Sequence, residues 1–129
     1  MVLDTSALIA LLLGEREAPS FRTALEAEVV RMVSAANLLE TAMVIETRLG
    51  DQGGRELDLL VQVAELEVVP VDSAQVAVAR RAFRRFGKGR HPAALNFGDC
   101  FAYALAVTTG EPLLFKGSDF AATDVPRVV

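Results

Sequence analysis

The chain has 129 residues, a length typical of one domain with its own core, and we expect a single domain over residues 1–129. Its composition, 52% hydrophobic and 23% charged, is that of a globular protein and excludes a disordered one. The net charge of −4 argues against bulk nonspecific attraction to nucleic acid.

The sequence also argues against membrane-spanning and disulfide-stapled proteins. The apolar run over residues 7–13 is far shorter than the roughly 20 residues that a spanning helix needs. With no recognisable export signal and a single cysteine, Cys100, we expect a cytoplasmic protein that does not bind a membrane. The single histidine, His91, excludes a multi-histidine metal site.

Short apolar segments alternate with longer helical patterns along the whole chain. In the first half we expect a strand over residues 1–3, a helix capped by Thr5 or Ser6 and ended by Gly14, a helix that starts between Glu15 and Ser20, a strand over 29–33, a helix over 35–49 capped by Ser34, and a helix over about 55–66. In the second half we expect a strand over 67–71, a helix over 73–86 capped by Ser73, a loop over 87–98, a helix over 99–109, a strand over 112–115 and a last strand near 125–129. This alternation predicts an α/β fold, a three-layer α/β/α sandwich around a short-stranded parallel sheet.

Four acidic residues lie in locally apolar segments, where a predicted strand ends or a predicted helix begins or runs. Carboxylates are rarely buried unless they are paired or bind a metal. Open parallel sheets bind their ligands at the carboxyl ends of the strands, where these acids are expected. Because Mg²⁺ and Mn²⁺ prefer oxygen ligands, the pattern predicts a divalent-metal site suited to phosphodiester hydrolysis. The four residues are Asp4, Glu40, Asp99 and Asp119.

Each acid also has a simpler interpretation. A role at a helix N-terminus would explain Asp4 and Asp99. A turn would explain Asp119, and an ion pair with an arginine such as Arg48, or simple exposure to solvent, would explain Glu40. Two other functions stay open beside a nuclease. One is a phosphatase with Asp4 as its nucleophile, although the position two residues on lacks the second acid that this chemistry needs. The other is a non-catalytic domain that binds RNA or protein.

The acids lie in segments that match one known family. MVLDTSALIALLLGE begins the chain, and LNFGDCFAYALA is followed by EPLLFKGSDF near its end. These segments resemble the first, third and fourth motifs of the PIN-domain ribonucleases, and more closely of the VapC-type toxins of bacterial toxin–antitoxin pairs. The helix segment from Asn37 to Glu40 is a weaker match. The resemblance implies a PIN-like fold, a Mg²⁺- or Mn²⁺-dependent endoribonuclease activity, and the role of toxin in a type II toxin–antitoxin pair.

The resemblance implies roles for individual residues and partners. Asp4 and Asp99 would be the main direct metal ligands. Glu40 would complete the acidic cluster, and Asp119 would bind a second metal or a bridging water. Ser6 matches a hydroxyl position of the family and would hold Asp4 or a water. The implied partners are an RNA substrate, usually tRNA or ribosomal RNA, a cognate antitoxin whose tail enters the site, and a second copy of the chain in a homodimer.

A basic segment precedes the third motif. Residues 73–98 contain no acid. A helical projection places the basic residues on one side and the apolar residues on the other, namely Val76, Ala79, Ala82, Phe83 and Phe86. We expect the apolar side to pack inward and the basic side to contact RNA phosphates. An ordinary solvated face, or a docking surface for an antitoxin or a second subunit, stays open. The basic candidates are Arg80, Arg81, Arg84, Arg85 and Lys88.

Three other residues near these motifs have simple expected positions. We expect His91 in a loop, Cys100 as a small buried helix residue and Tyr103 in the core. A phosphate contact by His91 and base stacking by Tyr103 are the alternatives.

Overall fold

The computed structural model describes residues 1–129, in which four short strands alternate with helices. The sheet has the order β3-β2-β1-β4, and every neighbouring pair is parallel. This confirms the predicted short-stranded parallel sheet. The strands are β1 (Val2–Leu3), β2 (Met32–Ser34), β3 (Glu67–Val69) and β4 (Leu113–Leu114); the helices are α1 (Thr5–Leu13), α2 (Ala18–Ala27), α3 (Ala35–Leu49), α4 (Asp51–Val63), α5 (Ser73–Phe86), α6 (Phe97–Thr109) and the 3-10 turn η1 (Phe120–Ala122).

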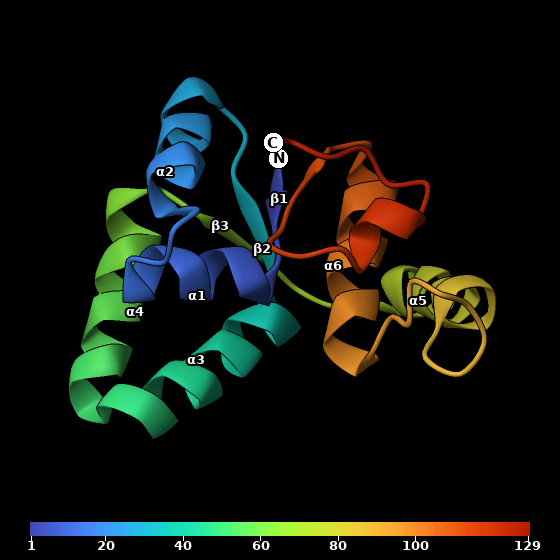
Figure 1. The fold of residues 1–129 in the computed structure, drawn as a ribbon, viewed down its shortest axis with the longest axis horizontal. Helices are drawn as coiled ribbons and strands as arrows, with labels where there is room; N and C mark the ends of the chain where they lie inside the picture. The colour runs from blue at the N-terminus through green and yellow to red at the C-terminus, as the bar shows by residue number, and fades with distance from the viewer.

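The sheet is covered on both faces, as the apolar strands predicted. Figure 1 shows α1, α2 and α4 on one side of the strands and α5 and α6 on the other. Successive strand residues point to opposite faces, and they divide accordingly. Val2 and Leu113 belong to the core packed under α5 and α6, whereas Leu3 and Leu114 belong to the core packed under α1 and α2. The three-layer α/β/α arrangement is therefore confirmed.

Helix α3 lies at the carboxyl end of the strands and packs against α1, α4 and α6. It therefore contacts helices from both sides of the sheet, α1 and α4 on one side and α6 on the other. The site described below lies where α1, α3 and α6 meet. None of the helices has the length and apolar character to cross a bilayer.

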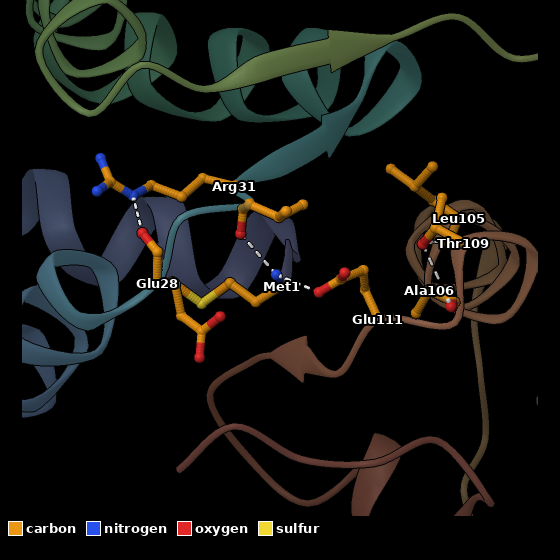
Figure 2. Close-up of polar contacts among 8 residues, drawn as sticks. Met1, Glu28, Arg31, Leu105, Ala106, Thr109 and Glu111 are labelled. Atoms are coloured by element: carbon orange, nitrogen blue, oxygen red, sulfur yellow. Dashed lines mark hydrogen bonds and ion pairs between the residues drawn. The ribbon is translucent and has the colours of Figure 1, made fainter.

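The start of β1 is held by polar contacts, which Figure 2 shows. The amine of Met1 donates to the carbonyl of Val30 at 2.6 Å and pairs with a carboxylate oxygen of Glu111 at 2.7 Å. Nearby, the Arg31 guanidinium donates to the carbonyl of Glu28 at 2.8 Å. In the last turn of α6 the Thr109 hydroxyl donates to the carbonyl of Leu105 at 2.6 Å. The two contacts of the Met1 amine hold the start of β1 between the segment that enters β2 and the turn that enters β4.

Several helix starts differ from the sequence prediction because acidic and amide side chains cap them. Asp4, rather than Thr5 or Ser6, is the N-cap of α1. Asp72, rather than Ser73, caps α5 by accepting the N–H of Gln75 at 2.8 Å. These side chains accept from backbone N–H groups that have no partner within the helix.

Other boundaries shift because of packing. Helix α4 begins at Asp51 instead of near residue 55. Gly53 permits this early start, since a Cβ there would lie 2.6 Å from the carbonyl oxygen of Ile45 in α3. Strand β2 covers Met32–Ser34, later than expected, and the expected last strand is reduced to one bridge between Leu113 and Arg127.

Candidate metal-dependent nuclease site

Asp4 lies where β1 ends and α1 begins. Its backbone N–H donates to the carbonyl of Leu114 at 3.0 Å, which places it beside the end of β4. One carboxylate oxygen, Oδ2, accepts the N–H and the hydroxyl of Ser6 at 3.0 and 2.6 Å. The other oxygen, Oδ1, is buried and has no hydrogen-bond partner. Burial raises the pKa of the Asp4 carboxyl, with a further contribution from the charge of Glu40, and the hydrogen bonds from Ser6 oppose this rise. A buried carboxylate oxygen of this kind is ready for a cation.

The Ser6 hydroxyl has a fixed orientation. It accepts the N–H of Lys116 at 3.0 Å, so its own proton points toward Asp4. Lys116 begins the loop that carries Asp119, and its ammonium group pairs with Glu15 in the turn after α1. Ser6 therefore links the first acidic segment of the site to the fourth.

Glu40 lies in α3 and reaches both α1 and α6. Its Oε1 accepts the hydroxyl proton of Thr5 and, at 3.4 Å, an amide proton of Asn37. The Asn37 amide also donates to the carbonyl of Gly98 at 3.0 Å. A Cβ on Gly98 would lie 2.2 Å from Glu40 Oε2, so the carboxylate occupies the space that any other residue would fill. The alternative ion pair with Arg48 is wrong, because Glu40 is held by neutral groups instead.

Asp99 occupies the first turn of α6 within a capping box. Its N–H donates to the Asn96 side chain at 2.9 Å, and its Oδ2 accepts the Asn96 N–H at 3.0 Å. The expected helix start at Asp99 is corrected, since α6 begins at Phe97. Burial raises the pKa of Asp99 to about 7 against the Asn96 hydrogen bond, and the charges of Asp4, Asp119 and Glu40 add to the rise.

Asp119 stands apart from the other three in its setting. It lies on an exposed loop after β4, directly before η1, and its side chain caps no helix. Its charge nevertheless contributes to the raised pKa of Asp99. The loop is tied down by Lys116, which pairs with Glu15 and, at 3.5 Å, with Glu17.

The four acids face a shared region at the carboxyl end of the sheet. The rise in the pKa of Asp99 shows that the other three are within electrostatic range of it. None of the ion pairs of the chain includes any of the four. No three acidic, histidine or cysteine side chains come close enough together to enclose one ion. The arrangement is therefore a loose group of like charges and not a closed metal cage.

Three positioning residues were not identified from the sequence. Thr5 was considered only as a helix cap, and Asn37 only as a neighbour of Glu40 on the helix. Gly98 was placed in a loop. The signals that could have found them are a hydroxyl next to Asp4, an amide three residues before Glu40 in an apolar helix, and a glycine directly before Asp99.

The four arginines of α5 are exposed, but they border two different hollows. Arg80 and Arg84 line a groove between α5 and α6. Arg81 and Arg85 lie on the opposite flank of α5, where Arg85 pairs with Asp124 at 3.1 Å. The exposed arginines of α5 thus reach both margins of its contact with α6.

The apolar side of α5 is different from the prediction. Ala82 and Phe86 are buried as expected, but Val76 and Phe83 are 42% and 40% exposed. A single helix, α6, covers α5, and its contact is centred on Ala82, so the apolar residues at the margin of this contact stay open to solvent. Lys88 is exposed at the start of the following loop.

The remaining expectations near the third motif agree with the structure. Tyr103 is buried and its hydroxyl donates to Asp124 at 2.6 Å, so the base-stacking alternative for it is wrong. His91 lies in the loop, where its Nδ1 accepts the N–H of Ala93 at 3.0 Å. Cys100 is buried in α6.

Comparison with known proteins decides the family. A model of the PIN domain matches residues 1–126. The chain belongs to the PIN-domain family. It is 54% identical to ribonuclease VapC30 of Mycobacterium tuberculosis over 128 residues, 99% of this chain and 98% of that protein. It is 55% identical to ribonuclease VapC of Mycolicibacterium smegmatis over 128 residues, 99% of each. These matches make it a VapC-type PIN-domain ribonuclease, as its motifs predicted.

Solved structures support the fold independently. VapC20 of Mycobacterium tuberculosis, described as a toxin that cleaves the sarcin–ricin loop, matches with a TM-score of 0.78 at 19% identity, over 96% of this chain and 95% of that one. A toxin–antitoxin complex from Klebsiella pneumoniae contains a chain that matches with a TM-score of 0.69 at 20% identity, over 95% and 92%. The PIN fold is thus shared at identities where the sequences have largely diverged.

Proposed function

We propose that this VapC-type ribonuclease is a Mg²⁺- or Mn²⁺-dependent endoribonuclease that acts in the cytoplasm as the toxin of a type II toxin–antitoxin pair. The observation that carries the proposal is the state of Asp4. It is 4% exposed, has one oxygen held by Ser6 and has the other without a partner. A carboxylate in this state, near the charges of Glu40 and Asp99 and with no ion-pair partner, calls for a divalent cation.

The donor set fits a hard cation. Every candidate ligand is a carboxylate oxygen, and the open arrangement suits Mg²⁺, which usually binds one or two carboxylates and keeps water and phosphate oxygens. We assign the main ligand positions to Asp4 and Asp99. When bound, the ion would neutralise charge on the scissile phosphate and acidify the attacking water.

The remaining residues of the site would act by holding these groups in place. Ser6 fixes the rotation of the Asp4 carboxylate through the hydrogen bond to Oδ2, and leaves Oδ1 free for the ion. Glu40, supported by Thr5, completes the negative field from the α3 side. Asp119 approaches from the loop after β4 and would bind a second ion or a bridging water.

The substrate proposal follows from the charge pattern and the relatives. The acids alone would repel RNA, so basic groups must hold the phosphate backbone. Arg80 and Arg84 line the groove between α5 and α6. They are the arginines of α5 that share a groove with residues from the first turn of α6, the turn that also carries Asp99. We propose a tRNA or ribosomal RNA substrate. VapC20 of Mycobacterium tuberculosis, which shares the fold, is described as a toxin that cleaves the sarcin–ricin loop.

We also propose that an antitoxin covers the site and that the chain forms a homodimer. The fold is shared with the chain in the Klebsiella toxin–antitoxin complex. A basic antitoxin tail would neutralise the four acids, which have no ion-pair partner within the chain. Sedimentation of the purified protein tests the dimer.

The experiment that tests the function is cleavage of total cellular RNA by the purified protein. Reactions with Mn²⁺, with Mg²⁺ and with EDTA are compared with the same reactions of Asp4→Asn. We expect discrete fragments that need the metal and disappear in the variant, and sequencing of their ends would identify the target. A folded wild-type protein that bound neither metal nor RNA would overturn the proposal in favour of a non-catalytic domain.

A further inference from the structure

Asn37 is a fully buried amide in the first turn of α3, and it contacts both of the other helices that build the site. Its exposed fraction is 0%. The amide nitrogen, Nδ2, donates to the carbonyl of Gly98 in α6 at 3.0 Å. The same nitrogen lies 3.4 Å from Glu40 Oε1 and 3.3 Å from the hydroxyl oxygen of Thr5 in α1. One side chain of α3 therefore joins α1 to α6 beside an acidic residue of the site.

The chemistry of these neighbours fixes the orientation of the amide group. The carbonyl of Gly98 and the carboxylate of Glu40 can only accept hydrogen bonds, and an amide nitrogen can only donate them. Thr5 gives its hydroxyl proton to Glu40, so its oxygen is also an acceptor for Asn37. The amide oxygen, Oδ1, is left buried without a hydrogen-bond partner. An unpaired buried oxygen costs stability, so core packing alone does not explain an amide at this position.

The contact with Gly98 acts directly on Asp99. The carbonyl of Gly98 belongs to the peptide group that leads into Asp99, and the N–H of that group donates to the Asn96 side chain at 2.9 Å. Because a peptide group is planar, hydrogen bonds at its oxygen and at its nitrogen fix its orientation. Asn37 holds the oxygen and Asn96 holds the N–H. The two side chains together fix the backbone from which the Asp99 carboxylate extends.

The contact with Glu40 acts on a second acid of the site. Its Oε1 accepts from both Asn37 and Thr5, and its Oε2 faces Gly98, where a Cβ would lie only 2.2 Å away. The carboxylate is thus held from two helices and packed against a third. Asn37 is itself held in place, because its backbone carbonyl accepts the hydroxyl of Thr41 at 2.7 Å. The amide therefore connects the Glu40 carboxylate to the peptide group of Asp99 through two hydrogen bonds.

We propose that Asn37 is a positioning residue that couples Glu40 to Asp99, so that the two carboxylates adopt their metal-binding arrangement together. The coupling rests on the proposed metal-dependent nuclease function and sets the geometry of that site without a direct contact to the ion. Groups that orient metal ligands through hydrogen bonds change metal affinity by about ten- to a hundredfold. Asn37→Ala should lower Mn²⁺ affinity by this amount. It should lower kcat and leave KM for RNA largely unchanged, because the buried amide cannot touch the substrate.

A double-mutant cycle tests the coupling without any RNA. The EPR signal of unbound Mn²⁺ measures the affinity of each protein. In the presence of Asn37, Glu40→Gln should lower the affinity at least about tenfold. In the Asn37→Ala background the same substitution should lower it by less than about threefold, because residues of one hydrogen-bond network have non-additive effects. A second cycle, with Asp99→Asn in place of Glu40→Gln, should be non-additive in the same sense.

The matched control is Gln75, the other buried side-chain amide of the chain. It lies in α5, is 7% exposed, donates to the carbonyl of Pro70 at 3.2 Å and also has an oxygen without a partner. Gln75→Ala should lower the melting temperature and keep full Mn²⁺ affinity, and its effect should add to that of Glu40→Gln. Asn37→Ser, a milder truncation that is also too short to reach Gly98, repeats the test if Asn37→Ala does not fold.

The possible results separate the coupling from the function on which it rests. Full Mn²⁺ affinity in a folded Asn37 variant, or additive losses in either cycle, would overturn the coupling and leave the nuclease site in place. An equal loss of affinity in Gln75→Ala would also overturn it, since any disturbance of the core would then have the same effect. If wild type neither binds Mn²⁺ nor cleaves RNA with it, the coupling and the metal-dependent function are both wrong.

Discussion

Asp4 and Asp119 lie at the carboxyl ends of neighbouring parallel strands, but the protein supports them in different ways. Asp4 is buried, caps α1 and has one oxygen fixed by Ser6. Asp119 is exposed and caps no helix, and its loop is held mainly by the ion pairs of Lys116. The difference indicates that the site has a rigid part and a more adjustable part. We call the rigid part, Asp4 and Glu40 with the residues that hold them, the floor, and the loop that carries Asp119 the rim. The floor would set the position of the cation, and the rim would adapt to the substrate.

The strongest test of this comparison removes one charge from each part. Asp4→Asn should lower kcat/KM for Mn²⁺-dependent RNA cleavage by at least about a hundredfold, as loss of a preorganised electrostatic group does. Asp119→Asn should lower it by only about tenfold, because the loop can move other groups into place. Both are measured on one defined RNA substrate. Equal losses would mean that the rim is as important for the cation as the floor.

A second test acts on the floor without touching a charge. Gly98→Ala would place a Cβ 2.2 Å from Glu40 Oε2, so the carboxylate must move away from α6. We expect Mn²⁺ affinity and cleavage to fall by about ten- to a hundredfold, the range seen for groups that orient metal ligands. Manganese titration followed by calorimetry measures the affinity.

The matched control is Gly54→Ala in α4. Its Cβ would meet only the flexible side chain of Glu46, at 3.0 Å, and alanine favours the helix. This variant should keep full metal affinity. A similar loss in both variants would point to general disturbance of the fold rather than to displacement of Glu40.

The third test uses the raised pKa of Asp99. In the unfolded chain the pKa of this carboxyl is near its ordinary value of 3.8, and in the folded protein it is about 7. Between these values the folded state binds more protons, so stability of the metal-free protein should fall as the pH rises through this window. Asp99→Asn removes the penalty and keeps an oxygen for the Asn96 N–H. Without metal its melting temperature should exceed that of wild type at pH 8, and the difference should shrink at pH 5.

Adding Mn²⁺ should reverse the order of the two proteins. An ion that binds only the folded state raises the melting temperature, and it should do so mainly for wild type. Scanning calorimetry at the two pH values, with and without Mn²⁺, gives all four differences. An equal rise in wild type and Asp99→Asn would place the metal elsewhere.

The parts that the sequence predicted well depend on local patterns. Apolar runs such as residues 1–3 and 112–115 are buried on both faces of a parallel sheet, so their order and spacing indicated the α/β class. Asp4 and Asp99 each lie where a strand ends or a helix begins, and those places are set by residues next to them in the chain. Gly14 and Gly110 end helices in the left-handed conformation, as expected of glycine.

The parts that it missed depend on contacts between distant segments. Asn37 joins Glu40 to Gly98, and its hydrogen bond to Gly98 connects residues 61 positions apart in the sequence. No local pattern specifies that contact. The burial of Val76 and Phe83 in α5 was predicted wrongly for a related reason. A helical projection shows which residues share a side, but it does not show that α6 covers only the strip around Ala82 and leaves Phe83 at the edge of a groove.

The smallest expected effect concerns the anchor of the rim. Lys116→Met removes the ion pairs with Glu15 and Glu17, which are partly exposed. Such pairs contribute at most about 1 kcal/mol, so the melting temperature should change little. Cleavage should nevertheless fall, by less than about tenfold, because the loop that carries Asp119 would lose its tether while the backbone N–H that Lys116 donates to Ser6 is kept. Arg55→Met, which removes an exposed side-chain hydrogen bond on α4, should leave cleavage unchanged. If Lys116→Met instead destabilised the fold strongly or abolished cleavage, the loop would belong to the rigid floor, and the two ends of the site would not differ in the way proposed.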